Sequence, residues 1–259
     1  MKKNVLAIII LACSMGLLWS CKKDLAHVNT FSNTEGLAFI KFFDASPNFR
    51  SIFKGADSFN IYVNGVKVNG SQLTYNSIFP SVANVYAGVP AGPQSIRITV
   101  NGKATPDSIT LASFNKTLEQ GAYYSLFLTD SALKNIDSKQ MWIRDQFLVT
   151  DTNNYTIRFV DAVMNDPIAV DVYSYRKGAN LFTGITPGTA TPFVLMPYTI
   201  LPDTFYVRQT GTMTEIARIN IVNGSTTATN RGRPYTILYK GGFGLTSTKA
   251  RSLTIFPND

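Results

Sequence analysis

The sequence predicts an all-β fold made of two tandem immunoglobulin-like β-sandwich domains. Three observations lead to this prediction: segments whose apolar residues recur at every second position, asparagine–glycine turns, and an internal repeat. The composition agrees, because aromatic residues make up 12% of the 259 residues and charged residues only 15%. Such a profile is typical of sheets rather than of long surface helices.

Alternation of period two marks the strands. In residues 95–100, isoleucine and valine alternate with serine, arginine and threonine. Ile40 and Phe42 point to one face of an earlier segment and Lys41 to the other, and Arg158 takes the place of Lys41 in the repeat. This pattern predicts sheets with one buried face, so that Lys41 and Arg158 are expected on the opposite face.

Turns separate the predicted strands. Asparagine and glycine both tolerate a positive φ, and their pairing is a strong hairpin signal. The spacing of these turns indicates about seven strands in each repeat, which favours a two-sheet sandwich. The pairs are Asn64-Gly65, Asn69-Gly70, Asn101-Gly102 and Asn223-Gly224.

The internal repeat divides the chain into residues 37–149 and 154–259. Segments of the first part return in the same order in the second, at offsets between 109 and 117 residues, which indicates a duplication. The matched segments are Ile40–Ala45 with Ile157–Ala162, Asn60–Tyr62 with Asp171–Tyr173, Ser95–Ile98 with Thr204–Val207, Gly121–Leu126 with Gly232–Ile237, and Gln140–Ile143 with Ser252–Ile255.

Tyr124 and Tyr235 stand at equivalent places, three residues after a glycine and at the start of a late strand. This is the position of the tyrosine corner, in which the hydroxyl bonds to an upstream backbone group. A tyrosine that only packs into the core is the alternative.

The N-terminus predicts a lipoprotein signal. Lys2 and Lys3 precede an apolar run from Val5 to Leu18, which is too short to span a bilayer comfortably and has the size of a secretory signal. Residues 1–20 are therefore the expected signal peptide, Cys21 the lipid attachment site, and residues 21–36 a tether. A rival cleavage site precedes Cys13, and an ordinary signal peptide or an uncleaved anchor is the alternative. The expected location is the cell envelope, on either face of the outer membrane.

Charge and cysteine content restrict the partners. The formal charge of +8 falls to +6 when Lys2 and Lys3 are removed, and the remaining cations are scattered. No nucleic-acid partner is expected for an exported chain of this kind. After lipidation of Cys21 no cysteine pair remains for a disulfide.

Four short motifs resemble domain-of-unknown-function family 4397. They are F-D-A-S-P at 43–47, N-I-Y-V-N-G at 60–65, P-A-G-P at 90–93 and G-A-Y-Y-S-L-F at 121–127. The resemblance covers residues 37–147 and, more weakly, 155–256, where the serine–proline pair is missing at 163–165. It implies immunoglobulin-like repeats of bacterial secreted and surface proteins, and it transfers no catalytic residue. The residues around Cys21 resemble lipoproteins of the Bacteroidetes group.

Catalytic and metal chemistry is not predicted. The only histidine, His27, lies in the tether, which excludes His-dependent nucleophilic triads and typical zinc sites. Asp151–Asn154 begins like a calcium loop but lacks its sixth-position glycine, and is interpreted as an interdomain turn. Asp44 and Asp161 fall in separate repeats, so we expect each to be a local turn acceptor rather than half of a glycosidase pair. Gly241–Gly244 lacks the residues of a phosphate loop. No catalytic residue, metal or cofactor is expected.

Two signals suggest contacts outside the sandwiches. The first repeat carries extra residues with aromatic and cationic side chains, which suit a sugar or a protein partner. The candidates in this loop are Phe49, Arg50, Phe53 and Lys54, and the alternative is that the phenylalanines fold back over the sandwich edge. Asp107-Ser108-Ile109 and Asp130-Ser131-Ala132 resemble O-glycan acceptor motifs, with Ser108 and Ser131 as acceptors.

These observations favour a non-catalytic binding module of the cell envelope, with a glycan or a protein as its partner. The alternative is a structural subunit of a surface assembly, such as an adhesin stalk or an accessory of an outer-membrane complex, joined through sheet edges. A hydrolase that uses carboxylates alone is the third hypothesis.

Overall fold

The computed structural model describes residues 34–49, 58–82, 85–100, 109–129, 140–148, 151, 153–199, 201–221 and 231–258. Gly36–Asp259 form one compact unit, which contains both repeats. Among the described residues, no helix has the length and hydropathy needed to cross a bilayer.

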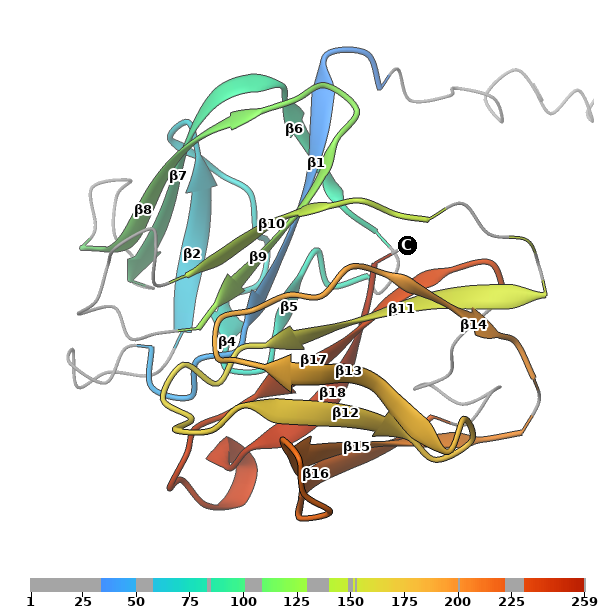
Figure 1. The fold of residues 1–259 in the computed structure, drawn as a ribbon. Helices are drawn as coiled ribbons and strands as arrows, with labels where there is room; N and C mark the ends of the chain where they lie inside the picture. Colours follow the sequence, from blue (N-terminus) through green and yellow to red (C-terminus); the bar gives the residue numbers. More distant parts are fainter. Residues whose placement is uncertain are drawn as a thin grey trace, which may run out of the picture. The chain divides into compact units, whose positions relative to one another are not determined.

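The second unit consists of strands, which confirms the predicted all-β fold (Figure 1). The first repeat contains β1 (Leu37–Asp44), β2 (Ser58–Val63), β3 (Val66–Lys67), β4 (Leu73–Thr74), β5 (Ile78–Phe79), β6 (Ala87–Pro90), β7 (Gly92–Val100), β8 (Thr110–Leu118), β9 (Tyr123–Leu128) and β10 (Met141–Asp145). The second contains β11 (Asn154–Asp161), β12 (Val170–Ser174), β13 (Ala179–Ile185), β14 (Val194–Pro197), β15 (Asp203–Gln209), β16 (Glu215–Ile221), β17 (Pro234–Lys240) and β18 (Ser252–Pro257), with the 3-10 turn η5 (Ser247–Lys249) before the last strand.

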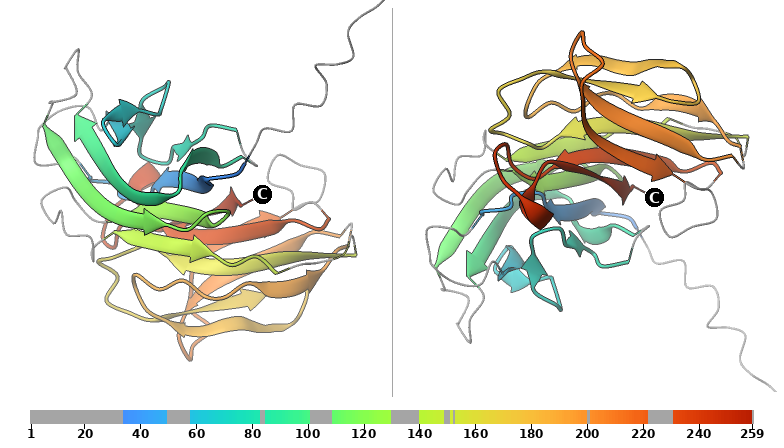
Figure 2. Two further views of the ribbon diagram at one scale, coloured as in Figure 1. Left: turned by 90° about the horizontal axis from the view of Figure 1, so that it is seen from above. Right: turned by 90° about the horizontal axis from the view of Figure 1, so that it is seen from below.

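Each repeat is a sandwich of two sheets. We call the sheet that packs against the other repeat the inner sheet and the remaining one the outer sheet. In the first repeat, the inner sheet has the order β10-β9-β1-β5 with β6 also paired to β1, and the outer sheet has the order β3-β2-β7-β8 with β4 paired to β2. In the second, the inner sheet is β14-β11-β17-β18 and the outer sheet is β13-β12-β15-β16. Figure 2 shows the two layers of the second repeat in yellow to red.

Strand pairing confirms the duplication. β1 pairs in parallel with β9, and β11 pairs in parallel with β17. Ile40 lies opposite Tyr124 in the first pair, as Ile157 lies opposite Tyr235 in the second, in agreement with the sequence match. The match of the closing strands is wrong by one residue: Trp142 pairs with Leu126 and Ile255 with the equivalent Ile237, so Trp142 corresponds to Ile255.

Each sandwich has its own apolar core between its two sheets. Phe49 belongs to the first core, where its ring lies 5.4 Å from that of Phe59, with 0% exposure. The Tyr124 hydroxyl accepts a 3.0 Å hydrogen bond from the Glu119 N–H, which confirms a tyrosine corner in the first repeat. The residue at the equivalent position upstream of Tyr235, Asn230, lies outside the described residues.

The prediction of one buried face is wrong for the inner sheets. Lys41 is 0% exposed and Arg158 2% exposed, because the second face of each inner sheet packs against the other repeat. A third apolar cluster fills this interface, and it includes Phe43, Phe127, Met141, Val160, Leu238 and Phe256. Phe256 of the second repeat packs against Phe43 and Phe127 of the first, with centroids 6.1 and 5.1 Å apart.

Polar groups also cross the interface. Arg158 of the second repeat donates across the interface from Nη2 to Asp145 Oδ1 at 2.5 Å. Within the first repeat, the Tyr86 and Ser125 hydroxyls each donate to Asp145 Oδ2 at 2.7 Å. In the reverse direction, Lys41 Nζ donates to the carbonyl oxygen of Pro257 at 2.5 Å. Equivalent cations thus reach across to the last strand of the other repeat, as in the self-complementary interface of a twofold dimer.

Candidate functional site

Most residues that the sequence singled out for contact or modification lie outside the described residues. This holds for Cys21, for Arg50, Phe53 and Lys54 of the candidate loop, and for Ser108 and Ser131. Phe49 is described and fully buried, so it folds back into the sandwich and offers no surface to a partner.

The structure confirms that Asp44 and Asp161 accept hydrogen bonds from the local turns that follow them. Asp44 Oδ1 accepts from the Ser46 N–H and Asp161 Oδ1 from the Val163 N–H, both at 3.0 Å. Asp151 Oδ1 accepts from the Asn153 N–H at 2.9 Å, which confirms a local turn there. Burial raises the pKa of Asp161 to about 7, opposed by its backbone hydrogen bond and assisted by the charge of Asp166.

The strongest candidate site is the outer face of the second repeat, on the neighbouring strands β12 and β15. Tyr173 lies directly opposite Tyr206, and Asp171 directly opposite Arg208. Directly opposite residues of an antiparallel pair project from the same face, so the four side chains form one surface. Val172 and Val207 point the other way, into the core. Strand alternation thus positions this group, which we call the tyrosine–arginine platform.

The guanidinium of Arg208 stacks on both tyrosines. Its Cζ lies 4.0 Å from the Tyr173 centroid and 5.2 Å from that of Tyr206, and the ring centroids are 6.3 Å apart. Cation–π attraction of this kind holds a planar cation against an aromatic face. The platform therefore presents aromatic and cationic groups together.

A hollow of about 490 Å³ lies beside the platform. Its size suits a small ligand or one to two sugar rings, on the general scale of ligand pockets, roughly 300–1,000 Å³. Six different types of side chain line it, together with a glycine of the β15–β16 turn. The lining residues are Asp171, Tyr173, Asn180, Arg208, Gly211, Thr212 and Met213.

Asp171 holds the rim of this hollow. Its Oδ1 accepts from the Gly184 N–H at 2.8 Å and the Thr210 hydroxyl at 3.0 Å, and its Oδ2 accepts from the Gly211 N–H at 3.1 Å and Asn180 Nδ2 at 3.3 Å. Partial burial alone would raise the pKa of Asp171, but the hydrogen bonds from Gly184, Gly211 and Thr210 outweigh it and lower the pKa below its usual value. Asp171 is therefore charged at neutral pH and ties both neighbouring hairpins to β12.

The first repeat does not repeat this site. Tyr62 stands where the second has Tyr173, and its partner across the strands is Arg97 rather than a tyrosine. Tyr62 is only 7% exposed, and the Arg97 Cζ lies 6.0 Å from its ring. Thr99 occupies the place of Arg208 and is fully buried.

Sequence reasoning missed the platform although a signal was present. The matched segments 95–98 and 204–207 place arginine in one copy and tyrosine in the other at the same outward position. Comparison of the two aligned repeats at this outward position would have shown that the outer faces differ, whereas neither repeat shows it alone.

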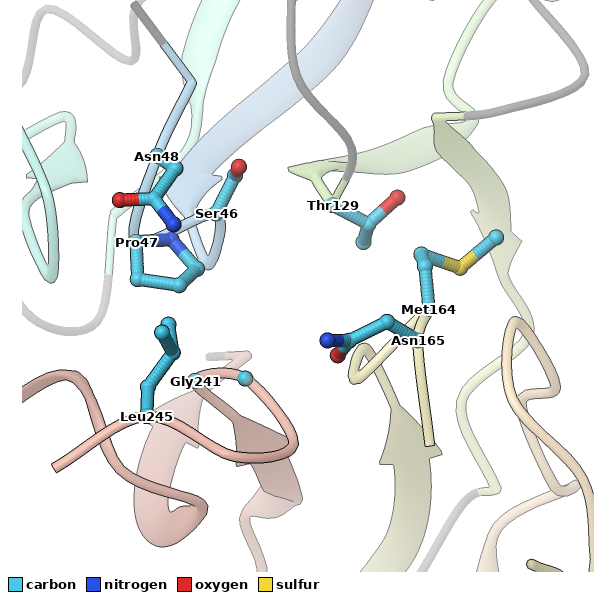
Figure 3. A pocket seen from close by; sticks show the side chains of 9 residues that line it. Ser46, Pro47, Asn48, Thr129, Met164, Asn165, Gly241 and Leu245 are labelled. Carbon is cyan, nitrogen blue, oxygen red and sulfur yellow. The ribbon is translucent and has the colours of Figure 1, made fainter. Parts of the chain in front are cut away.

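A second hollow of about 190 Å³ lies between the loops that follow β1 and β11 (Figure 3). Asn48 and Asn165 occupy equivalent positions in these loops. Asn165 bonds both the N–H and the carbonyl of Phe243, at 3.0 and 3.2 Å, and Asn48 accepts from Lys249 Nζ at 3.1 Å. Its two amides already bond protein groups, so this hollow is the weaker candidate. No group of three or more His, Cys, Asp or Glu suited to a metal occurs within the described part of the chain.

Comparison with solved structures gives low similarity. The Bacillus anthracis TIE protein is 13% identical with a TM-score of 0.23, and the match covers 80% of this chain and 34% of that one. The chain thus spans about a third of that protein. A streptococcal family 41 carbohydrate-binding module that recognises α-glucan is 9% identical with a TM-score of 0.26, covering 85% of this chain and 97% of the other.

A DUF1812 protein of Bacteroides thetaiotaomicron, for which polysaccharide binding has been suggested, is 12% identical with a TM-score of 0.24, covering 81% and 94%. Similarities of this size carry no functional information. No curated protein matches the chain.

One family model matches the sequence over residues 38–173, which is more than half of the 259 residues. The match covers the first sandwich and continues through β11 to Tyr173 on β12. Its description is a domain of unknown function, and it agrees with the motifs at 43–47, 60–65, 90–93 and 121–127. The chain therefore belongs to the domain-of-unknown-function family DUF4397.

Proposed function

We propose that this protein is a non-catalytic glycan-binding module of the bacterial cell envelope, held to the outer membrane by a lipid on Cys21. The observation that carries the proposal is the tyrosine–arginine platform beside its hollow. Sugar rings place C–H groups on the faces of aromatic rings and satisfy their hydroxyls with nearby polar groups. The platform offers both kinds of contact on one sheet face.

The scaffold also favours binding. Tyr173, Tyr206 and Arg208 lie on strands β12 and β15, which pair in continuous register, and the contact of Arg208 with both rings holds the group in place before a ligand arrives. Less conformational entropy is then lost on binding. Asp171 adds to this by tying two hairpins to the same strand.

The alternative role, as a structural subunit joined through sheet edges, has less support. Two edge strands carry an exposed large apolar side chain, Val66 on β3 and Leu195 on β14, whereas the edge strands β8 and β16 carry none, so no edge presents a row of apolar anchors. Strand addition uses main-chain pairing together with pockets for alternate side chains. The half-buried aromatic and cationic groups of the platform lie on a sheet face instead.

Binding of the mature chain to an oligosaccharide array, followed by calorimetry on the positive glycans, tests the glycan-binding part. Tyr173→Ala and Tyr206→Ala should each weaken binding about tenfold, which is about 1.4 kcal/mol. Arg97→Ala, on the outer face of the first repeat, is the matched control and should leave the affinity unchanged. An array without any positive glycan would refute the proposed function.

The lipid part has a separate test. Cells that express the full chain and are fed labelled palmitate should incorporate the label, and Cys21→Ala should abolish incorporation. Labelling that persists in Cys21→Ala would exclude Cys21 as the anchor.

A further inference from the structure

We infer that the sugar recognised on the platform carries a carboxylate, and that Arg208 is the residue that binds it. This inference rests on the proposed function and specifies the ligand class for the same site. It depends on the hydrogen-bonding state of Arg208, on the engagement of Asp171, and on the position of Met213.

The guanidinium of Arg208 is held in place by stacking, but its hydrogen-bond donors are not satisfied. Two tyrosine faces hold its guanidinium, at 4.0 and 5.2 Å, but stacking uses none of its N–H donors. Among the described residues its buried Nε has no hydrogen-bond partner, and Nη1 contacts the Met213 sulfur at 3.6 Å. A thioether is a weak acceptor, and no oxygen partner of this guanidinium occurs within the described ranges.

Four other arginines in the described ranges differ in this respect. Arg144, Arg158, Arg218 and Arg251 each lie within 3.5 Å of a carboxylate oxygen. Arg208 has no such ion pair in the same part of the chain. A guanidinium presents its donors as a planar fork that matches a carboxylate, so an external carboxylate is the natural partner.

Asp171 does not fill this role, although it lies directly opposite Arg208 in the strand register. Both of its oxygens are engaged by Gly184, Thr210, Gly211 and Asn180. The same bonds keep it oriented toward the hairpins. Arg208 therefore stays available on the wall of the hollow that both residues line.

Met213 covers the open edge of the guanidinium. Its side chain is 78% exposed and lies in the turn between β15 and β16. An unbranched thioether side chain moves readily between rotamers. A carboxylate that approaches the terminal nitrogens would displace it, and a smaller residue should therefore leave binding intact or strengthen it.

The test compares two probes that differ only in the group at C6: galacturonate oligosaccharides and the same oligosaccharides after reduction of their carboxylates to alcohols. Calorimetry of the mature chain should show at least tenfold tighter binding of the acidic probe. Arg208→Thr, which copies the residue of the first repeat, should abolish this preference. Arg208→Lys should keep only part of it, because the charge remains and the planar fork is lost.

Each outcome is decisive. Equal affinity for both probes, lost in Tyr206→Ala, would overturn the carboxylate inference and leave the proposed function standing. If neither probe binds but neutral glycans on the array do, the carboxylate inference fails as well. An array without any positive glycan overturns both. Thermal unfolding of each variant is the control for folding. Met213→Ala tests the displacement of Met213, and Arg97→Ala is the control for the loss of a positive charge elsewhere on the protein.

Discussion

The two repeats share one fold and differ on both of their sheet faces. On the outer face, the first repeat carries Tyr62 with Arg97, and the second carries Tyr173 with Tyr206. On the inner face, Lys41 and Arg158 are equivalent, yet Arg158 bonds a carboxylate and Lys41 a main-chain carbonyl. Duplication thus supplied two copies of each surface, of which one pair packs together and the other has diverged.

The difference between the two inner faces follows from one pair of equivalent positions, Asp145 and Asn258. Asp145 ends β10, and Asn258 follows β18 at the equivalent place. Asn258 Nδ2 donates to the Tyr86 hydroxyl at 3.0 Å, and its Oδ1 accepts from the Thr236 hydroxyl at 2.7 Å. Asp145 therefore places a carboxylate opposite Arg158, whereas the equivalent Asn258 extends the hydrogen-bond network without adding charge.

The largest expected effect comes from removing one side of the charged pair. Arg158→Met leaves Asp145 buried without its cation and should lower the free energy of unfolding by about 3–5 kcal/mol. Chemical denaturation at neutral pH measures this change. The double variant Arg158→Met with Asp145→Asn carries neither charge and should recover much of the loss. A single variant as stable as the parent would show that the pair does not hold the repeats together.

A pH effect of nearly the same size is expected from Asp161. Its pKa rises from 3.8 to about 7 in the folded chain because of burial. Between these values the folded state binds a proton that the unfolded state has lost, so stability falls as the pH rises. The total fall is at most about 4 kcal/mol, at about 1.4 kcal/mol for each pKa unit.

Denaturation between pH 4 and pH 8 checks this slope. Asp161→Asn keeps an oxygen for the Val163 N–H and should remove the fall. Asp151→Asn changes an exposed carboxylate and is the control. An unchanged slope in Asp161→Asn would assign the pH dependence to another group.

A smaller loss is expected for the equivalent cation of the first repeat. Lys41→Met removes the donor to the Pro257 carbonyl. The cost of an unsatisfied buried carbonyl is about 1–3 kcal/mol. The same denaturation series, run beside Arg158→Met, measures the difference between the two copies. A larger loss for Lys41 than for Arg158 would reverse the comparison.

Local patterns predicted the sandwiches well because each strand and turn depends on nearby residues. The alternation of Ile40, Lys41 and Phe42 correctly separates two faces. It cannot show that the Lys41 face meets a second sheet, because that depends on how two distant segments pack. The contacts of Arg208 could not be predicted for the same reason. Its two tyrosine partners, Tyr173 and Tyr206, lie on different strands and are 33 residues apart in the sequence.

The smallest expected effect concerns the tyrosine corners. Tyr124→Phe removes the acceptor of the Glu119 N–H, and the loss of one such hydrogen bond costs about 1 kcal/mol. Tyr235→Phe is the matched variant, because Tyr235 occupies the same register position opposite Ile157 as Tyr124 does opposite Ile40. Equal losses in chemical denaturation would show that both copies use the hydroxyl in the same way. A loss in Tyr124→Phe alone would show that the second copy keeps its tyrosine for packing, and that the two repeats have diverged in a local turn as well as on their faces.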